Sequence, residues 1–498
     1  MTSQVATLRF SLLTSSLVSA GCFTIGDKQG DEAEDTTDEN TTDEDTTNLG
    51  TTGDTDSDVD TETDTNSNDP CIDLEPGPDP TSTRIAIQEC LALGSAHLGA
   101  GTFIVDQGLT VPAGAILLGA GRDQTFVQLG SSATNYLISL VGGAEVGALH
   151  LDAAQKLPAA PVNAVVVVTG SGNTLHDLYV GELAGTLPGL RDQAVYFVDS
   201  TSTGNVLRDS ELSGTFYGVI FVAGLPAGSG NRVENVEIHD HPCDSVTFVG
   251  YGEVVGSHIH DNGWDCENGP IPGGGLYSLG NTVGARIEDN VIHDTCGHGI
   301  DLDQAQGFEI VGNSIYDPGN TWGGARPWCG GAAAIALMDS SHNTLSNNML
   351  ENNDRPQNAG SDPNQVFHAE GAPAFSDLPM NAVIALAISQ RPGSPGSAMG
   401  NQVDGNVLHA ACASGCIGVG YFSSRGTGTD ALGAWSAETT GYYTANNPFG
   451  SNVGSVRCGG NWYAASSDCP ASPTDPACNQ DDYQHTFDWS RNDDCRDF

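Results

Sequence analysis

The 498-residue sequence predicts an all-β protein built as a parallel β-helix, a solenoid in which each coil of the chain is one structural repeat. Two observations lead to this prediction. An irregular internal repeat runs through the middle of the chain, and each repeat holds short runs of alternating apolar residues separated by Gly, Asn or Asp. The composition agrees, because 64 glycines and only 7% aromatic residues suit a protein with many turns and short strands.

Residues 1–21 have the pattern of an export signal. Arg9 precedes an apolar run that starts at Phe10, and the small residues 19–21 end the segment. Cys22 follows directly, which resembles the lipobox of bacterial lipoproteins and implies that Cys22 is acylated. The 13 cysteines less Cys22 leave an even number that can pair in an oxidising compartment. We expect a lipoprotein of the outer membrane or cell surface; the alternative is cleavage after Ala20 and a secreted protein.

Residues 22–70 form an acidic linker rich in Thr and Asp. Such a segment has no residues from which to build a core, so we expect a disordered tether between the lipid and the folded body. The whole chain has 63 acidic and 16 basic residues and a formal charge of -47. This charge repels nucleic acid and anionic membrane surfaces, so the lipid is the expected membrane contact. We expect a monomer.

Residues 71–455 are expected to form the β-helix and its N-terminal cap. Apolar residues at helical spacing from Ser82 to Leu93 predict a helix, which two strand-like segments follow. This opening resembles the cap of pectate-lyase-like proteins, and the resemblance implies a right-handed parallel β-helix with a helical plug on its first coil. The repeat units recur at roughly 21 to 35 residues, and they begin at Gly172, Gly204, Gly230, Val255, Ile287, Ile310, Asn343 and Gly400.

The alignment of these repeats predicts which residues share a position in successive coils. One inward aliphatic stack is expected, flanked by Asn and Asp that bond backbone groups across coils; its members are Val180, Leu212, Ile238, Ile259, Ile292, Ile315, Leu350 and Leu408. His239, His260 and His293 also share one position, with Tyr316 and Glu351. A column of imidazoles is a plausible set of metal ligands, but this shared position favours stacking at the turns.

The remaining cysteines are interpreted as disulfides. Residues 456–498 hold four of them in a Pro-, Asp- and Ser-rich segment, which predicts a disulfide-rich C-terminal cap or tail. Four others follow the aligned turns, and we expect bridges between adjacent coils there because rungs lie roughly 4.8 Å apart; they are Cys243, Cys266, Cys296 and Cys329. A metal cluster is the rival interpretation, but paired Cys-x-x-Cys spacing is missing.

The candidate catalytic residues lie on the strand after these turns. Alternation places Asp301 and Asp303 outward in otherwise apolar rows, roughly 6.6 Å apart along the strand, which is within the range of paired-carboxylate glycosidases. His298, just upstream, is expected to assist them. The segment from Cys296 to Ile300 resembles a short polygalacturonase signature, whose other motifs are absent from the coils. The alternatives are a solvated acidic row, or a calcium site at Asp301 and Asp303, which makes calcium the one candidate cofactor.

Aromatic residues near this strand suggest carbohydrate as the partner. Tyr277 lies in the adjacent row, and loop residues Trp264, Trp322, Arg326 and Trp328 are candidates for binding the substrate, since flat aromatic faces match the C–H faces of sugars. Tryptophans packed over apolar strands are the alternative.

Two functions follow from these candidates. The first is a cell-surface carbohydrate-active protein, a polysaccharide hydrolase rather than a lyase, because elimination needs cationic groups and the chain offers only Lys28, Lys156 and scattered Arg. A neutral glycan, or an acidic one bridged by calcium, suits the charge. The second is a non-catalytic adhesion or glycan-binding lipoprotein.

Overall fold

The computed structural model describes the folded body in several stretches. These are residues 70–130, 134–153, 163–181, 192–263, 274–280, 282–316, 333–352 and 400–411, with the backbone of strands at 382–388, 417–423, 453–458 and 461–463. The predicted signal, Cys22, nearly all of the linker and most of the C-terminal tail lie outside these residues. Within these stretches no helix is long and apolar enough to cross a membrane.

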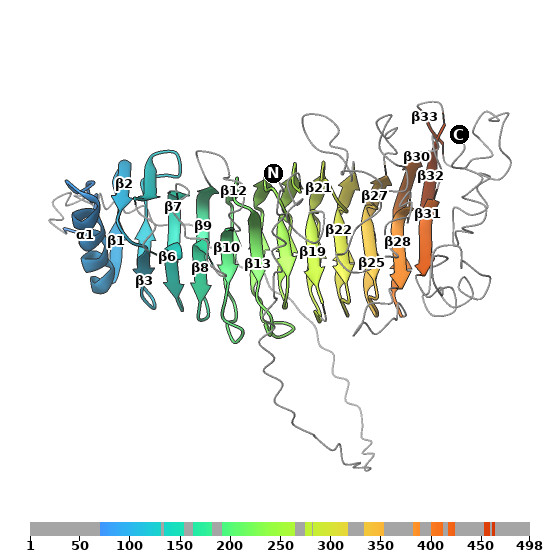
Figure 1. Cartoon of the computed structure of the whole chain (residues 1–498), viewed down its shortest axis with the longest axis horizontal. Coiled ribbons are helices and arrows are strands. Elements are labelled where there is room, and N and C mark those ends of the chain that lie inside the picture. Colours follow the sequence, from blue (N-terminus) through green and yellow to red (C-terminus); the bar gives the residue numbers. More distant parts are fainter. Residues whose placement is uncertain are drawn as a thin grey trace, which may run out of the picture. The chain divides into compact units, whose positions relative to one another are not determined.

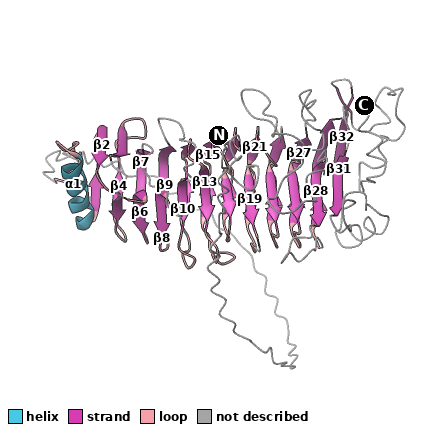
Figure 2. Cartoon of the chain, viewed as in Figure 1, coloured by secondary structure: helices cyan, strands magenta, loops and turns pink. Residues whose placement is uncertain are grey.

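A helix, α1 (Pro80–Leu93), covers the first coil (Figures 1 and 2). It begins there because the carboxylate of Asp79 accepts a hydrogen bond from the Ser82 amide at 2.9 Å. It ends at Gly94, which has φ of 119° and a backbone N–H that donates to the Leu91 carbonyl. A disulfide between Cys71 and Cys90 ties the helix to the preceding segment. The predicted helical cap is confirmed.

One face of the solenoid is an 11-stranded sheet, in which every strand pairs in parallel with the equivalent strand of the next coil (Figure 1). Its strands in order are β3 (Leu109–Val111), β6 (Tyr136–Val141), β8 (Ala164–Thr169), β10 (Gln193–Phe197), β13 (Tyr217–Phe221), β16 (Val246–Phe248), β19 (Leu276–Leu279), β22 (Ile300–Asp303), β25 (Ile335–Met338), β28 (Ala382–Ile388) and β31 (Ile417–Ser423).

The second sheet has 22 strands in two ladders, whose pairings are parallel except for the last pair of the second ladder. The ladders share the long strands β7 (Glu145–Asp152) and β9 (Thr174–Gly181). The first ladder contains β1 (Ser95–His97), β4 (Ile116–Leu118), β11 (Val206–Arg208), β14 (Arg232–Glu234), β17 (Glu253–Val255), β20 (Arg286–Glu288), β23 (Glu309–Val311), β26 (Thr344–Ser346) and β29 (Gln402–Asp404). The second contains β2 (Gly101–Val105), β5 (Thr125–Leu129), β12 (Glu211–Ser213), β15 (Glu237–His239), β18 (His258–His260), β21 (Val291–His293), β24 (Ser314–Tyr316), β27 (Met349–Asn352), β30 (Val407–Ala411), β32 (Val453–Cys458) and β33 (Asn461–Tyr463).

These pairings confirm the predicted parallel β-helix. Among the described strands, antiparallel pairing occurs between β32 and β33, and β32 crosses the predicted boundary at residue 455. The predicted aliphatic stack has the register that the repeats indicated, from Val180 opposite Leu212 to Leu350 opposite Leu408. Phenylalanines form a second internal stack, in which the Phe221 ring lies 4.9 Å from Phe197 and 5.5 Å from Phe248.

Two polar features hold the corners of the coils. Buried asparagines form ladders in which each Nδ2 donates to the Oδ1 of the next coil, as in Asn290 to Asn313 at 2.9 Å and Asn313 to Asn348 at 3.0 Å. One residue upstream of each rung, the chain turns through a left-handed residue. Examples are Asp289, with φ of 54° before Asn290, and Asn347, with φ of 56° before Asn348. Asn, Asp and Gly adopt this conformation at the lowest cost, which is why they recur there.

Candidate functional site

The predicted acid pair lies on the outer face of the 11-stranded sheet. Ile300 and Leu302 of β22 point into the core, so Asp301 and Asp303 point away from it. Asp301 lies opposite Tyr277 in one neighbouring strand and Ala336 in the other. The rows predicted from the repeats are therefore present.

The environment of the pair differs from a solvated acidic row. The side chains of Asp301 and Asp303 are only 5% and 3% exposed, and Thr247 and Tyr277 in the adjacent rows are equally buried. Removing a carboxylate from water costs several kcal/mol unless other groups replace the water. A group of buried polar side chains on the outer face of a sheet, away from the hydrophobic core, is typical of a binding or catalytic site.

Asp244 belongs to the same face, and the repeat alignment did not single it out. One of its oxygens accepts the backbone N–H of Gly274 at 3.1 Å, and the other accepts the hydroxyl of Thr247 at 3.4 Å. Burial raises the pKa of Asp244 to about 7. The turn that carries Asp244 directly precedes β16, as the turn with His298 precedes β22, and this shared position was the available signal.

His298 lies inside the turn before β22 and is buried. Its Nδ1 accepts the backbone N–H of Ala333 in the next coil at 2.8 Å. Burial lowers the pKa of His298 to about 3, so the imidazole is neutral at pH 7 and the proton lies on Nε2. These contacts suit a residue that positions the turn rather than one that supplies a positive charge.

The predicted sugar-binding residues fall in two groups. Tyr277 lies on β19 directly between Thr247 and Asp301. Trp264, Trp322, Arg326 and Trp328 lie outside the described residues, and their predicted role stays a prediction.

The cysteines of the aligned turns are engaged in disulfides where they are described. Cys243 and Cys296 are both disulfide-bonded. Cys266 and Cys329 lie outside the described residues, so the expected pairing between coils stays a prediction.

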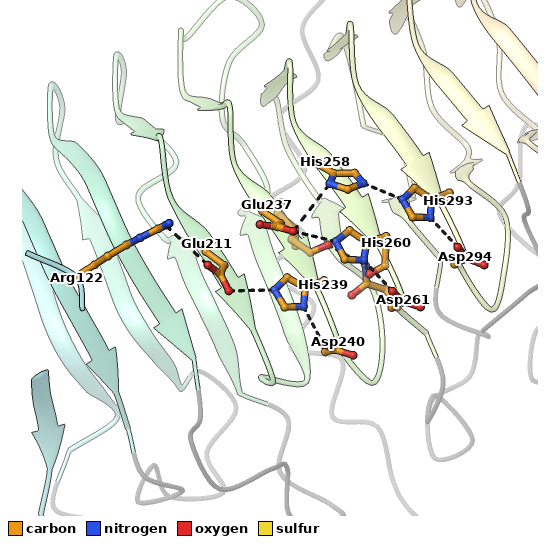
Figure 3. Close-up of polar contacts among 12 residues, drawn as sticks. Arg122, Glu211, Glu237, His239, Asp240, His258, His260, Asp261, His293 and Asp294 are labelled. Atoms are coloured by element: carbon orange, nitrogen blue, oxygen red, sulfur yellow. Dashed lines mark hydrogen bonds and ion pairs between the residues drawn. The ribbon is translucent and has the colours of Figure 1, made fainter. Parts of the chain in front are cut away.

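A second polar cluster lies on the outer face of the other sheet (Figure 3). The imidazoles of His239, His260 and His293 stack with ring centroids 5.1 Å apart and nearly parallel planes, and Tyr316 continues the stack at 4.7 Å. The predicted stacking at the turns is thereby confirmed. His258, two residues before His260 on β18, also points outward beside the stack.

Carboxylates flank this histidine stack on both sides. In each stacked imidazole, Nδ1 is hydrogen-bonded to a carboxylate oxygen of the Asp that follows it in the sequence, at 2.7–2.8 Å. Nε2 of His239 lies 3.3 Å from Glu211, and Nε2 of His260 lies 3.3 Å from Glu237. Burial lowers the pKa of His239, but its bonds with Asp240 and Glu211 outweigh burial and raise the pKa above its usual value. Burial, and then the charges of neighbouring imidazoles, lower the pKa of His258.

Comparisons with known proteins agree with the coils described above. A family model described as "Right handed beta helix region" matches residues 164–361. No curated protein matches the sequence. Among solved structures, the A-module of mannuronan C-5 epimerase AlgE6 from Azotobacter vinelandii is 14% identical, with 78% of this chain and 93% of that chain covered and a TM-score of 0.49.

Two further solved structures are similarly distant. DFA-IIIase from Arthrobacter chlorophenolicus is 11% identical over 77% of this chain and 96% of that one, with a TM-score of 0.44. The Dettilon tailspike protein is 14% identical over 70% of this chain and 66% of that one, with a TM-score of 0.42. Likenesses at this level do not extend to function.

Proposed function

We propose that this chain, a right-handed parallel β-helix repeat protein, is a carbohydrate-active protein that hydrolyses a polysaccharide on the outer face of β16, β19 and β22. One observation carries the proposal. Asp244, Asp301 and Asp303 are three carboxyl groups buried on one outer face, together with Thr247 and Tyr277 and outside the hydrophobic core. Carboxyl groups in such surroundings are suited to proton transfer at a sugar.

The proposed reaction uses Asp301 and Asp303 as general acid and general base. One carboxylic acid donates its proton to the glycosidic oxygen as the C–O bond breaks, and the other carboxylate takes a proton from the water that adds to the anomeric carbon. The Cα atoms of residues two apart on a strand are about 6.6 Å apart, and their side chains leave the sheet in the same direction, so we expect a similar spacing between the two carboxyl groups. This spacing is at the lower end of the range of inverting hydrolases, which leave room for that water.

The charge of the chain bears on the substrate. A formal charge of -47 disfavours polyanionic glycans, so we propose a neutral polysaccharide. An acidic polysaccharide bridged by calcium at Asp301 and Asp303 is the alternative, and it makes activity depend on added calcium.

The test measures reducing ends released from neutral and acidic polysaccharides, with calcium or with a chelator. D301N and D303N are each expected to lower turnover by about 100-fold or more, as expected for the loss of a general acid or base. D289N is the matched control, because it makes the same change in the opposite sheet at a turn position that Asn occupies at Asn347. Unchanged turnover in D301N and D303N would exclude the assignment.

A second candidate function is glycan binding without cleavage. The sequence favours it, because the polygalacturonase-like segment from Cys296 to Ile300 stands without the other motifs of that family and no complete catalytic signature is present. The same polysaccharides immobilised on an array distinguish the two functions. Retention of wild-type protein without soluble products supports binding alone, and soluble products support hydrolysis.

We also propose that the protein is exported and held at the outer membrane or cell surface by an acylated Cys22, with the acidic linker as a tether. The pattern of residues 1–22 supports this proposal. Mass spectrometry of the mature N-terminus should find an acylated Cys22, and a free Gly21 start contradicts it.

A further inference from the structure

Three strands of the 22-stranded sheet place a carboxylate and three imidazoles together on its outer face (Figure 3). Glu237 of β15 lies directly opposite His258 of β18, and His260 of β18 lies opposite His293 of β21. Their neighbours Ile238, Ile259 and Ile292 fill the core, so the polar side chains point outward. This cluster lies on a different sheet from Asp301 and plays no part in the function proposed above.

Hydrogen bonds decide which nitrogens carry protons when these rings are neutral. Asp261 accepts from Nδ1 of His260 at 2.8 Å, and Asp294 accepts from Nδ1 of His293 at 2.7 Å. In each of these two neutral rings, Nε2 therefore carries a lone pair and no proton. Nε2 of His258 lies 2.8 Å from Nε2 of His293, so it must be the donor of that bond. Neutral His258 then carries its proton on Nε2, and its Nδ1 has a lone pair that can bind a metal ion.

When the rings are neutral, three electron-pair donors therefore face one another with no proton between them. Nε2 of His260 lies 3.3 Å from Oε1 of Glu237, and Nδ1 of His258 lies 4.0 Å from that oxygen. One ligand atom from each of the three residues lies within 4.8 Å of the others. A proton shared by Glu237 and His260 satisfies that pair but leaves the lone pair of His258 facing the carboxylate. A single cation satisfies all three.

We propose that Glu237, His258 and His260 form a binding site for a divalent transition-metal ion, with the chemistry of Zn²⁺. Two imidazoles and one carboxylate are borderline and hard ligands of the kind that Zn²⁺ takes, and a water supplies the fourth tetrahedral position. Ligand atoms at about 2.05 Å from a tetrahedral ion are about 3.3 Å apart. The spacing between His260 and Glu237 already has this value, and the half-exposed side chain of His258 needs a small rotation.

The surroundings include the second layer of contacts that metal-binding histidines usually have. Asp261 accepts a hydrogen bond from Nδ1 of His260, and this bond orients the ring and makes Nε2 a better metal ligand. His293 likewise accepts a hydrogen bond from Nε2 of His258, the ring nitrogen that faces away from Glu237. The stack of His239, His260 and His293 fixes the ring planes from both sides. Stacking and metal binding are therefore compatible, because the stack uses ring faces and the metal uses ring edges.

The experiment is calorimetric titration of the mature full-length protein, without a histidine tag, with zinc chloride. Excess calcium in the buffer occupies the many carboxylates of this acidic chain. One equivalent of Zn²⁺ is expected to bind tightly in the wild type. H258Q is expected to weaken binding by about 100-fold or more, and D261N, which loses only a supporting contact, by about 10- to 100-fold. H260F is expected to weaken binding like H258Q while keeping a ring in the stack.

H239Q is the matched control. His239 occupies the same column as His260, with equivalent partners in Asp240 and Glu211. The residue two positions before it on β15 is Glu237, where β18 has His258. H239Q is expected to keep the affinity for Zn²⁺ within a few-fold. Replacement of Zn²⁺ by Co²⁺ is expected to give the strong visible absorption of a tetrahedral site in the wild type and not in H258Q. Absence of Zn²⁺ binding, or equal affinity in the wild type, H258Q and H260F, overturns the proposal.

Discussion

Replacing Asn313 by alanine should remove a central rung of a buried amide ladder. Oδ1 of Asn313 accepts both the backbone N–H of Asn290, at 3.0 Å, and its Nδ2, while the Nδ2 of Asn313 donates to Oδ1 of Asn348 at 3.0 Å. Alanine leaves the buried N–H of Asn290 without its acceptor, which costs about 1–3 kcal/mol, and removes two ladder bonds worth about 0.5–1.5 kcal/mol each. We expect N313A to lower the free energy of unfolding by about 2–6 kcal/mol.

Two variants separate this mechanism from a general effect of substitution. N313S should be intermediate, because Ser257 occupies the equivalent position in another coil and its hydroxyl accepts the amide of Val236 at 3.2 Å. N347G should change stability little, because Asn347 has φ of 56° at a position where Gly405 stands in the next coil.

Urea denaturation followed by circular dichroism measures the loss, and hydrogen exchange of the Asn290 amide detects an opening confined to neighbouring coils, which repeat proteins allow. If N313A and N347G were equally stable, the ladder would not contribute as argued.

Two further predictions concern the cap and Asp244. The disulfide of Cys71 and Cys90 joins residues 19 apart in sequence, so C71S/C90S should lose about 3 kcal/mol of stability; an unchanged urea midpoint contradicts this. Because the pKa of Asp244 is raised to about 7 in the fold, the folded state binds more protons than the unfolded state between pH 4 and 7, and stability falls as pH rises across that range. D244N keeps an acceptor for Gly274 and should gain in melting temperature over the wild type from pH 4 to 7; a pH-independent difference rules out this linkage.

Much of the architecture was accessible from sequence because the coil repeats. Isoleucine and leucine recur with the same turn residues, so an alignment of repeats is also a prediction of register, and Ile259 and Ile292 lie opposite each other as expected. The outward direction of Asp301 and Asp303 follows from strand alternation in the same way. Their burial does not follow, because alternation predicts direction and not what surrounds a side chain.

The histidine face shows the same division. The stacking of His239, His260 and His293 could be predicted, since all three share one repeat position. The participation of His258 could not, because it belongs to a different column, where its neighbours are Glu237 and Val291. A site built from two columns depends on the separation of adjacent strands and on the rotamers that hydrogen bonds select.

The sequence by itself therefore determined the coil, the inward stack, the capping helix and the direction of each outward side chain, because all of these depend on local periodicity and turn chemistry. Only the tertiary structure decided that Asp244 joins the face of Asp301 and that Glu237, His258 and His260 share one point in space. Those groupings arise between coils, where residues 20 to 60 positions apart come within about 5–10 Å through strand pairing. The protonation of a carboxyl or imidazole depends on that neighbourhood, and no periodicity along the chain encodes it.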